Sequence, residues 1–160
     1  LDLDAWVAKV VEEEAAKLPA VVTIECMLGL DGLVAAIDPE RMSRGLINLI
    51  SNASEALVGK GDELHGDASF VPAINIESGR TVRGIEISVT DNGPGITAEN
   101  LLRIKEPLFT TKSFGTGLGL SAVEKILQQH GGGLEIKSKP GEGARFTAWF
   151  PLIETLEEAA

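Results

Sequence analysis

The alternation of apolar and polar residues along the chain changes period several times and predicts both helices and strands. Apolar residues recur at helical spacing in three segments, which are expected to form helices: 5–18, 38–59 and 120–130. Shorter runs rich in Val, Ile and Thr are expected to form strands: 20–28, 33–38, 85–91 and the two halves of 133–152.

Residues that typically begin or end helices support several of these boundaries. Asp38 and Pro39 suit the N-cap and first position of the central helix, and Gly59 suits its end. Gly131 offers a stop for the helix at 120–130. The strand at 85–91 places Ile85, Ile87 and Val89 on one face, which predicts that this face is buried.

The remaining segments fix the expected fold class. Residues 60–83 are irregular and predict a long loop with a short strand at 73–77, and 139–143 reads as the turn of a hairpin. Strands and helices do not alternate strictly. We therefore expect an α+β domain over residues 1–160, a two-layer sandwich in which about three helices cover one face of a mixed, roughly five-stranded sheet.

Composition then narrows the classes of function. The chain has 160 residues, 44% of them hydrophobic, enough for one well-cored domain. Its net charge of −10 argues against nucleic acid as a partner. No apolar run approaches membrane-spanning length, so no membrane contact by this domain is expected. The single Cys26 lies in an apolar run and is expected to be a buried structural thiol in a reducing compartment.

The central helix carries two opposed stripes. An apolar stripe comprises Leu46, Ile50, Ala53 and Leu57. On the other side stand Asn48, Asn52 and Glu55, with Arg41 and Arg44. A solvated face is the simplest interpretation of such a stripe, but solvated faces favour Lys, Glu and Arg over Asn. Amide oxygens four residues apart also suit a hard cation such as Mg²⁺, which binds few protein groups together with phosphates.

Glycines at alternate positions precede the last predicted helix. Gly115, Gly117 and Gly119 match neither a P-loop nor a dinucleotide fingerprint, since Leu120 stands where the latter needs glycine. Such a loop can be a plain connector. It also leads into a helix N-terminus, where free N–H groups and the helix dipole favour phosphate.

A second glycine-containing segment, "DNGPGI", follows the strand at 85–91. Asn-Gly-Pro-Gly is a strong turn signal. Asp91 at the strand end could also accept a hydrogen bond from an exocyclic amino group. Gly93 and Gly95 would let a flat ring lie against the backbone. This combination suits adenine.

Taken in order, these segments resemble a known family. "NLISNASEAL" (48–57), "DNGPGI" (91–96), "EPLFTTK" (106–112) and "GTGLGL" (115–120), followed by "GEGARFTAWFPL", are similar to the N, G1, F and G2 boxes of sensor histidine kinases. These kinases belong to the Bergerat-fold ATP-binding superfamily. The resemblance covers nearly the whole chain and implies that it is their catalytic ATP-binding domain.

The resemblance also implies roles for single residues. Asn52 would coordinate Mg²⁺ at the ATP phosphates with support from Asn48, Asp91 would accept from adenine N6, and Lys112 would offer a charge to the phosphates. Thr110 and Thr111 would begin an ATP lid, with Phe109 packed at its base. The other residues implied to contact nucleotide are Gly93, Gly95, Ile96, Gly115, Thr116, Gly117, Leu118, Gly119 and Leu120.

Two positions depart from the family pattern. Glu55 stands where many members carry Lys or Arg toward the phosphates, and we expect it to be uninvolved and solvent-facing. Ala144 stands where relatives often have a hydroxyl near adenine. The lid between Lys112 and Gly115 consists of just Ser113 and Phe114.

The phosphoacceptor histidine is expected elsewhere. Neither His65 nor His130 is followed by the sequence typical of an acceptor, so the dimerisation and phosphoacceptor helices should precede Leu1. The resemblance implies a cytoplasmic domain, inactive in autophosphorylation alone, in a homodimeric parent that is either soluble or membrane-bound and signals to a response regulator.

Three alternatives remain at this point: a hydrolytic ATPase of the gyrase or chaperone type, a protein-serine kinase, or a non-catalytic nucleotide-binding module. The hydrolytic relatives use a Glu general base at the position of Asn48, whose amide cannot act as one.

Overall fold

The computed structural model describes residues 1–58, 71–103 and 118–152. Within these residues nine elements follow one another: α1 (Leu3–Ala15), β1 (Thr23–Leu28), α2 (Pro39–Val58), β2 (Ala73–Thr81), β3 (Gly84–Asp91), α3 (Ala98–Leu101), α4 (Leu118–Gln129), β4 (Gly133–Ser138) and β5 (Ala144–Phe150). The predicted Gly59 helix end and His65 lie outside the described residues.

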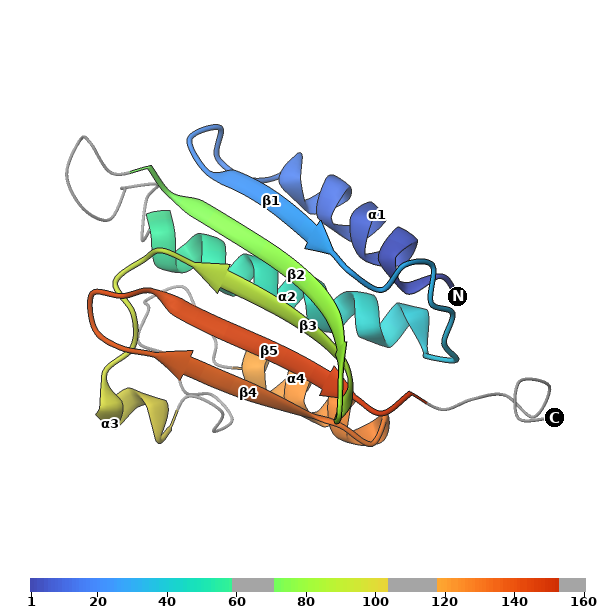
Figure 1. Ribbon diagram of the computed structural model, residues 1–160. Coiled ribbons are helices and arrows are strands. Elements are labelled where there is room, and N and C mark those ends of the chain that lie inside the picture. The colour runs from blue at the N-terminus through green and yellow to red at the C-terminus, as the bar shows by residue number, and fades with distance from the viewer. Residues whose placement is uncertain (59–70, 104–117, 153–160) are drawn as a thin grey trace, which may run out of the picture.

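The strands form one mixed sheet in the order β1-β2-β3-β5-β4. β1 pairs with β2 in parallel, and the other three pairings are antiparallel. Helices α1, α2 and α4 lie behind one face of this sheet (Figure 1). The expected two-layer α+β sandwich is therefore confirmed.

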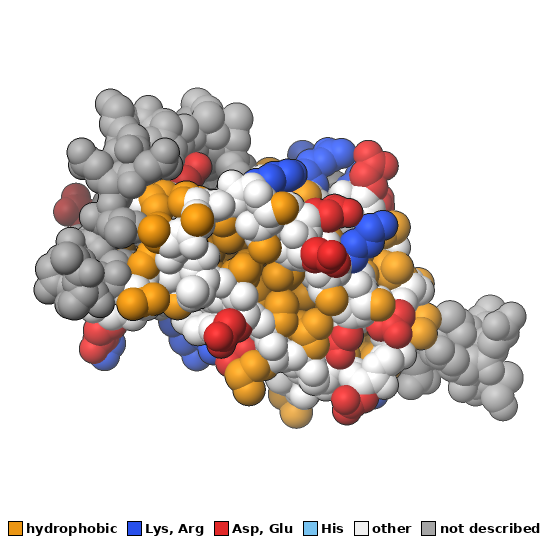
Figure 2. All heavy atoms as spheres, turned by 90° about the horizontal axis from the view of Figure 1, so that it is seen from above, with side chains coloured by type: hydrophobic (Ala, Val, Ile, Leu, Met, Phe, Trp, Pro, Cys, Tyr) orange, Lys and Arg blue, Asp and Glu red, His pale blue; other side chains and the backbone are white. Residues whose placement is uncertain are grey.

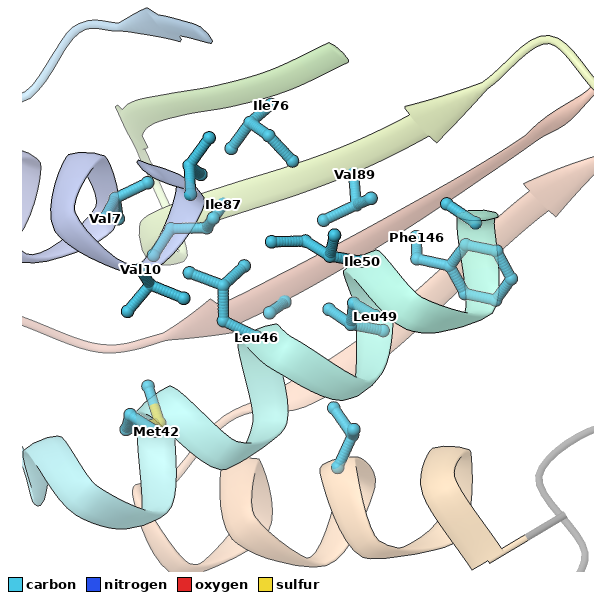
Figure 3. Close-up of a cluster of buried hydrophobic side chains, with 14 of the residues drawn as sticks. Val7, Val10, Met42, Leu46, Leu49, Ile50, Ile76, Ile87, Val89 and Phe146 are labelled. Carbon is cyan, nitrogen blue, oxygen red and sulfur yellow. The ribbon is translucent and has the colours of Figure 1, made fainter. Parts of the chain in front are cut away.

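The core lies between α2 and the sheet. α2 directs Leu46, Leu49 and Ile50 toward β3, whose Ile87 and Val89 face them (Figure 3). The predicted apolar stripe is buried throughout, with Leu46 5%, Ile50 1%, Ala53 0% and Leu57 0% exposed. The predicted inner face of β3 is buried as well.

Local chemistry explains where the helices begin and end. The Asp2 carboxylate accepts from Ala5 N–H at 3.0 Å and caps α1, which begins earlier than the predicted residue 5. Asp38 caps α2 as predicted, because its Oδ1 accepts from Arg41 N–H at 3.1 Å. The indole N–H of Trp6 donates to Ser43 Oγ at 2.7 Å and joins α1 to α2.

Two strand predictions are wrong. Residues 33–38 form no strand, since Val34 makes only an isolated bridge with Asp2. β2 is longer than the predicted short strand, and residues 78–81 belong to it rather than to a loop. Pairing with β3 extends β2 through Arg80, opposite Ile85, and Thr81, opposite Gly84.

The burial predicted for Cys26 is also wrong, because this residue is exposed. β1 is an edge strand, and on its helix-facing side Ile24 and Leu28 are themselves only half-buried. Figure 2 looks onto this edge of the sandwich and shows hydrophobic side chains exposed along it. Within the described residues, no helix has both the length and the apolar character needed to cross a membrane.

Candidate functional site

The polar stripe of α2 faces the beginning of α4. Asn48 and Asn52 are half-buried and stand one helical turn apart. A Cβ added to Gly119 would lie 4.0 Å from both Cβ and Cγ of Asn48, so the first turn of α4 approaches this side chain closely. The structure thus places an amide side chain beside a helix N-terminus, whose first N–H groups lack helical acceptors.

Asp91 ends β3 on the helix side of the sheet. Its side chain is buried at 3% exposure, and Oδ1 accepts from the backbone N–H of Gly93 at 2.9 Å. A Cβ at Gly93 would lie 2.9 Å from that oxygen and 3.2 Å from the carbonyl oxygen of Ala56. Only a glycine allows this approach, which brings the strand end against the C-terminal half of α2.

Side-chain bonds hold the segment after Asp91 in place. The amide of Asn92 donates to the Val71 carbonyl at 2.9 Å and accepts from Ala73 N–H at 2.8 Å, which joins the segment to the start of β2. Ile96 N–H donates to Ser138 Oγ at 2.8 Å. Sequence reasoning missed both anchors: Asn92 was visible as a turn residue, whereas nothing near Ser138 in sequence marks it.

The structure brings part of the predicted site together. Asn48 and Gly119 are adjacent, and Asp91 and Gly93 adjoin the same helix, α2, through Ala56. Leu120 is 7% exposed and packs in the core, so any contact with phosphate falls to its backbone N–H. The remaining predicted contacts lie outside the described residues: Phe109, Thr110, Thr111, Lys112, Gly115, Thr116 and Gly117.

Two further predictions concern the polar residues of the helices. Glu55 is half-buried, so it is less open to solvent than predicted. His130 holds the end of α4 to the start of α2. Its Nε2 accepts from Asp38 N–H at 3.1 Å, and Nδ1 lies 2.9 Å from the Ile126 carbonyl oxygen. These bonds give His130 a structural role at the end of α4.

A hollow of about 410 Å³ lies away from these residues, at the β4 edge of the sheet, and is lined by Arg83, Leu101, Leu134, Glu135, Ile136 and Trp149. Arg83 donates to Glu135 at 2.9 Å and to Glu86 at 3.1 Å, and its guanidinium stacks 5.1 Å from the Trp149 ring. The hydrogen bond from Arg83 lowers the pKa of Glu135. Because these charges satisfy one another, the hollow is a weaker candidate for a phosphate ligand.

Comparison with known proteins identifies the family to which this chain belongs. The model of the family described as "Histidine kinase-, DNA gyrase B-, and HSP90-like ATPase" matches residues 37–154. The chain belongs to this family. The described parts of the predicted site, Asn48 to Gly119, fall inside the matched region.

Sensor histidine kinases are among the relatives of this chain. Sensor histidine kinase ZraS of Escherichia coli O157:H7 is 44% identical over 76% of this chain. Nitrogen regulation protein NtrY of Azorhizobium caulinodans is 37% identical over 69% of it. The chain spans only 24% of the ZraS sequence and 14% of NtrY.

Solved structures agree with this assignment. The catalytic domain of histidine kinase ThkA superposes with a TM-score of 0.75 at 29% identity, covering 95% of this chain and 93% of that one. Full-length ShkA in complex with AMPPNP matches with a TM-score of 0.77 at 23% identity, covering 97% of this chain and 31% of that one, and supports the fold. The chain is therefore an ATP-binding catalytic domain of the sensor histidine kinase type.

Proposed function

We propose that this domain binds Mg-ATP between α2, the 91–96 segment and α4, and that it transfers the γ-phosphate to a histidine on a separate dimerisation domain. The observation that carries the proposal is the buried Asp91 carboxylate, which Gly93 N–H orients beside the helix that bears Asn48 and Asn52. The adenine end and the phosphate end of one nucleotide would thus contact the same helix.

At the adenine end, Asp91 would accept a hydrogen bond from the exocyclic amino group. The bond from Gly93 N–H engages Oδ1, so Oδ2 would be the oxygen offered to the base. A buried carboxylate makes a strong acceptor because the surrounding dielectric is low. Gly93 and Gly95 would leave the face of the ring close to the backbone.

At the phosphate end, the free N–H groups of the first turn of α4 favour an anion. Asn48 and Asn52 offer neutral oxygen donors, which fit Mg²⁺ when the nucleotide supplies the negative charge. We assign the metal contact to Asn52, with Asn48 supporting it. When bound, Mg²⁺ would neutralise charge on the phosphate oxygens. Lys112 would add a positive charge from the lid.

Transfer suits this site better than hydrolysis. The amide of Asn48 cannot take a proton from water, whereas phosphoryl transfer depends chiefly on positioning and charge neutralisation. Both ring nitrogens of His130 are engaged within the fold. His65, like His130, is not followed by the sequence typical of an acceptor. We therefore propose that the acceptor lies outside this chain, on dimerisation helices of a homodimeric parent that signals to a response regulator. We also propose that this domain lies in the cytoplasm and is inactive in autophosphorylation by itself.

The decisive test is calorimetric titration with ATP, in Mg²⁺ and again in EDTA. We expect binding that weakens without the metal. Asp91→Asn keeps an oxygen to accept from Gly93 N–H but turns an NH₂ toward the adenine amino group. It should lose about 2 kcal/mol, roughly thirtyfold in affinity.

A matched pair of variants on α2 tests the phosphate end. Asn52→Ala should abolish the difference between Mg²⁺ and EDTA, whereas Ser51→Ala, an exposed neighbour on the same helix, should leave it intact. Steady-state ADP release should be slow in the absence of dimerisation helices. Rapid turnover by the chain alone would contradict transfer as its function.

A further inference from the structure

One hydroxyl joins the 91–96 segment to the β4–β5 turn. Ser138 Oγ accepts from Ile96 N–H at 2.8 Å and donates to the carbonyl oxygen of Gly143 at 2.5 Å. Ser138 is the last residue of β4, and Gly143 directly precedes β5. A single side chain therefore spans the two ends of the turn and the segment beside it.

The two backbones are in close contact around this hydroxyl. Gly95 and Gly143 have φ of +77° and +74°, values that side chains disfavour. A Cβ on Gly95 would overlap the Lys139 carbonyl oxygen, and one on Gly143 would overlap the carbonyl oxygen of Asp91. The N–H of Gly141 also donates to the Pro94 carbonyl at 2.6 Å. The β4–β5 turn therefore packs directly against the 91–96 segment.

We infer that Ser138 is a positioning residue for the adenine end of the site, an inference that rests on the proposed function. Its hydroxyl holds Ile96 at one end of the segment. Through Gly143 it also holds the backbone against which Asp91 packs. A hydroxyl can accept and donate at once, which is what this junction requires.

Removing the hydroxyl would leave Ile96 N–H and the Gly143 carbonyl without these bonds at a partly buried position. The segment would then sample other conformations, and apparent affinity would fall in proportion to the binding-competent fraction. Because Ser138 lies at the adenine end of the proposed site, the affinities for ATP and ADP should decrease by the same factor. Preference for ATP over GTP should decrease as well, because a displaced Asp91 discriminates less between the bases.

The experiment measures dissociation constants of the 160-residue chain for ATP, ADP and GTP by calorimetry, together with thermal unfolding. We expect Ser138→Ala to bind ATP and ADP about tenfold more weakly, which corresponds to a tenfold smaller binding-competent fraction. Ser138→Thr, which keeps the hydroxyl, should restore affinity. Ser88→Ala is the matched control, since it removes the buried 3.0 Å bond to Thr147 on the outer face of the sheet.

The outcomes separate this inference from the proposed function. If Ser138→Ala lowers the melting temperature as Ser88→Ala does but retains wild-type affinity and selectivity, Ser138 is purely structural and the inference is wrong. A decrease in affinity for ATP without a decrease in affinity for ADP would also overturn the inference. If Asp91→Asn binds all nucleotides like wild type, the proposed adenine site itself fails. Should Ser138→Ala not fold, Ser138→Cys, a weaker hydrogen-bonding group, takes its place with the same criteria.

Discussion

Gly45 offers a quantitative test of the packing between α2 and α4. It is buried in the interior of α2, and an added Cβ would lie 3.9 Å from Val123 Cγ1 and 4.0 Å from Ile126 Cδ1. These are ordinary van der Waals separations. A cavity of about 20 Å³ adjoins this position and is lined almost wholly by apolar side chains. The structure therefore has room for a methyl group at residue 45.

Gly45→Ala should stabilise the domain. Ala is favoured over Gly in a helix interior by about 1 kcal/mol. Burying the methyl adds up to about 0.8 kcal/mol. A gain of roughly 1 to 2 kcal/mol corresponds to a rise in melting temperature of about 2–8 °C for a domain of this size.

Urea unfolding and a thermal scan of the wild type and of Gly45→Ala measure this gain. ATP titration serves as the control and should give equal affinities, since Gly45 lies on the apolar side of α2. An unchanged or lowered midpoint, at equal m-value, would show that the α2–α4 interface is tighter than the structure indicates.

Three further predictions address other parts of the molecule. Gly119→Ala should leave the domain at least as stable as the wild type, because its methyl meets Asn48 at an ordinary 4.0 Å. It should weaken ATP binding about tenfold by crowding the phosphates; equal affinity would place the phosphates elsewhere. Cys26 should react with one equivalent of maleimide in the native protein, at a rate that increases with pH as the reactive thiolate forms. This increase should extend to higher pH than for a free thiol, because partial burial raises the pKa of Cys26; labelling only in denaturant would restore the buried assignment. Glu135→Gln should destabilise the fold at pH 7, because Arg83 lowers the pKa of Glu135 in the folded state. The difference should begin to shrink as the pH falls through about 4.5, the ordinary pKa of this carboxyl, and should be lost below its lowered pKa in the folded state. A pH-independent difference in urea midpoint would contradict that last coupling.

The parts of the fold that sequence predicted well are those set by local chemistry. The caps of α2, its buried stripe and the β4–β5 hairpin depend on residues close together in the chain. Residues 33–38 have a strand-like pattern, but Val34 finds only Asp2 as a partner, which no local pattern reveals. Cys26 was misjudged because its apolar surroundings suggest burial, whereas exposure follows from the place of β1 at the sheet edge.

The residues of the candidate site were likewise predictable only in part. Asn48, Asn52 and Asp91 carry side chains with recognisable chemistry, so they could be proposed from sequence. Ser138 could not, because its role depends on contact with Ile96, 42 residues away, and on a turn whose position only the sheet determines. The spatial closeness of Gly119 to Asn48 likewise required the packing of α4 on α2.

The anchoring of the 91–96 segment also links nucleotide binding to the completeness of folding. Asn92 bonds to Ala73 in β2, 19 positions away, and to Val71 just before β2, 21 positions away. Ile96 bonds to Ser138 in β4, 42 positions away. The adenine end of the site therefore exists only after these distant strands have assembled. Partly folded chains should not bind ATP, so the ligand acts wholly on the native state and adds about 2.7 kcal/mol of stability when its concentration is 100 times the dissociation constant. Cellular nucleotide would then also set the lifetime of the domain against proteolysis.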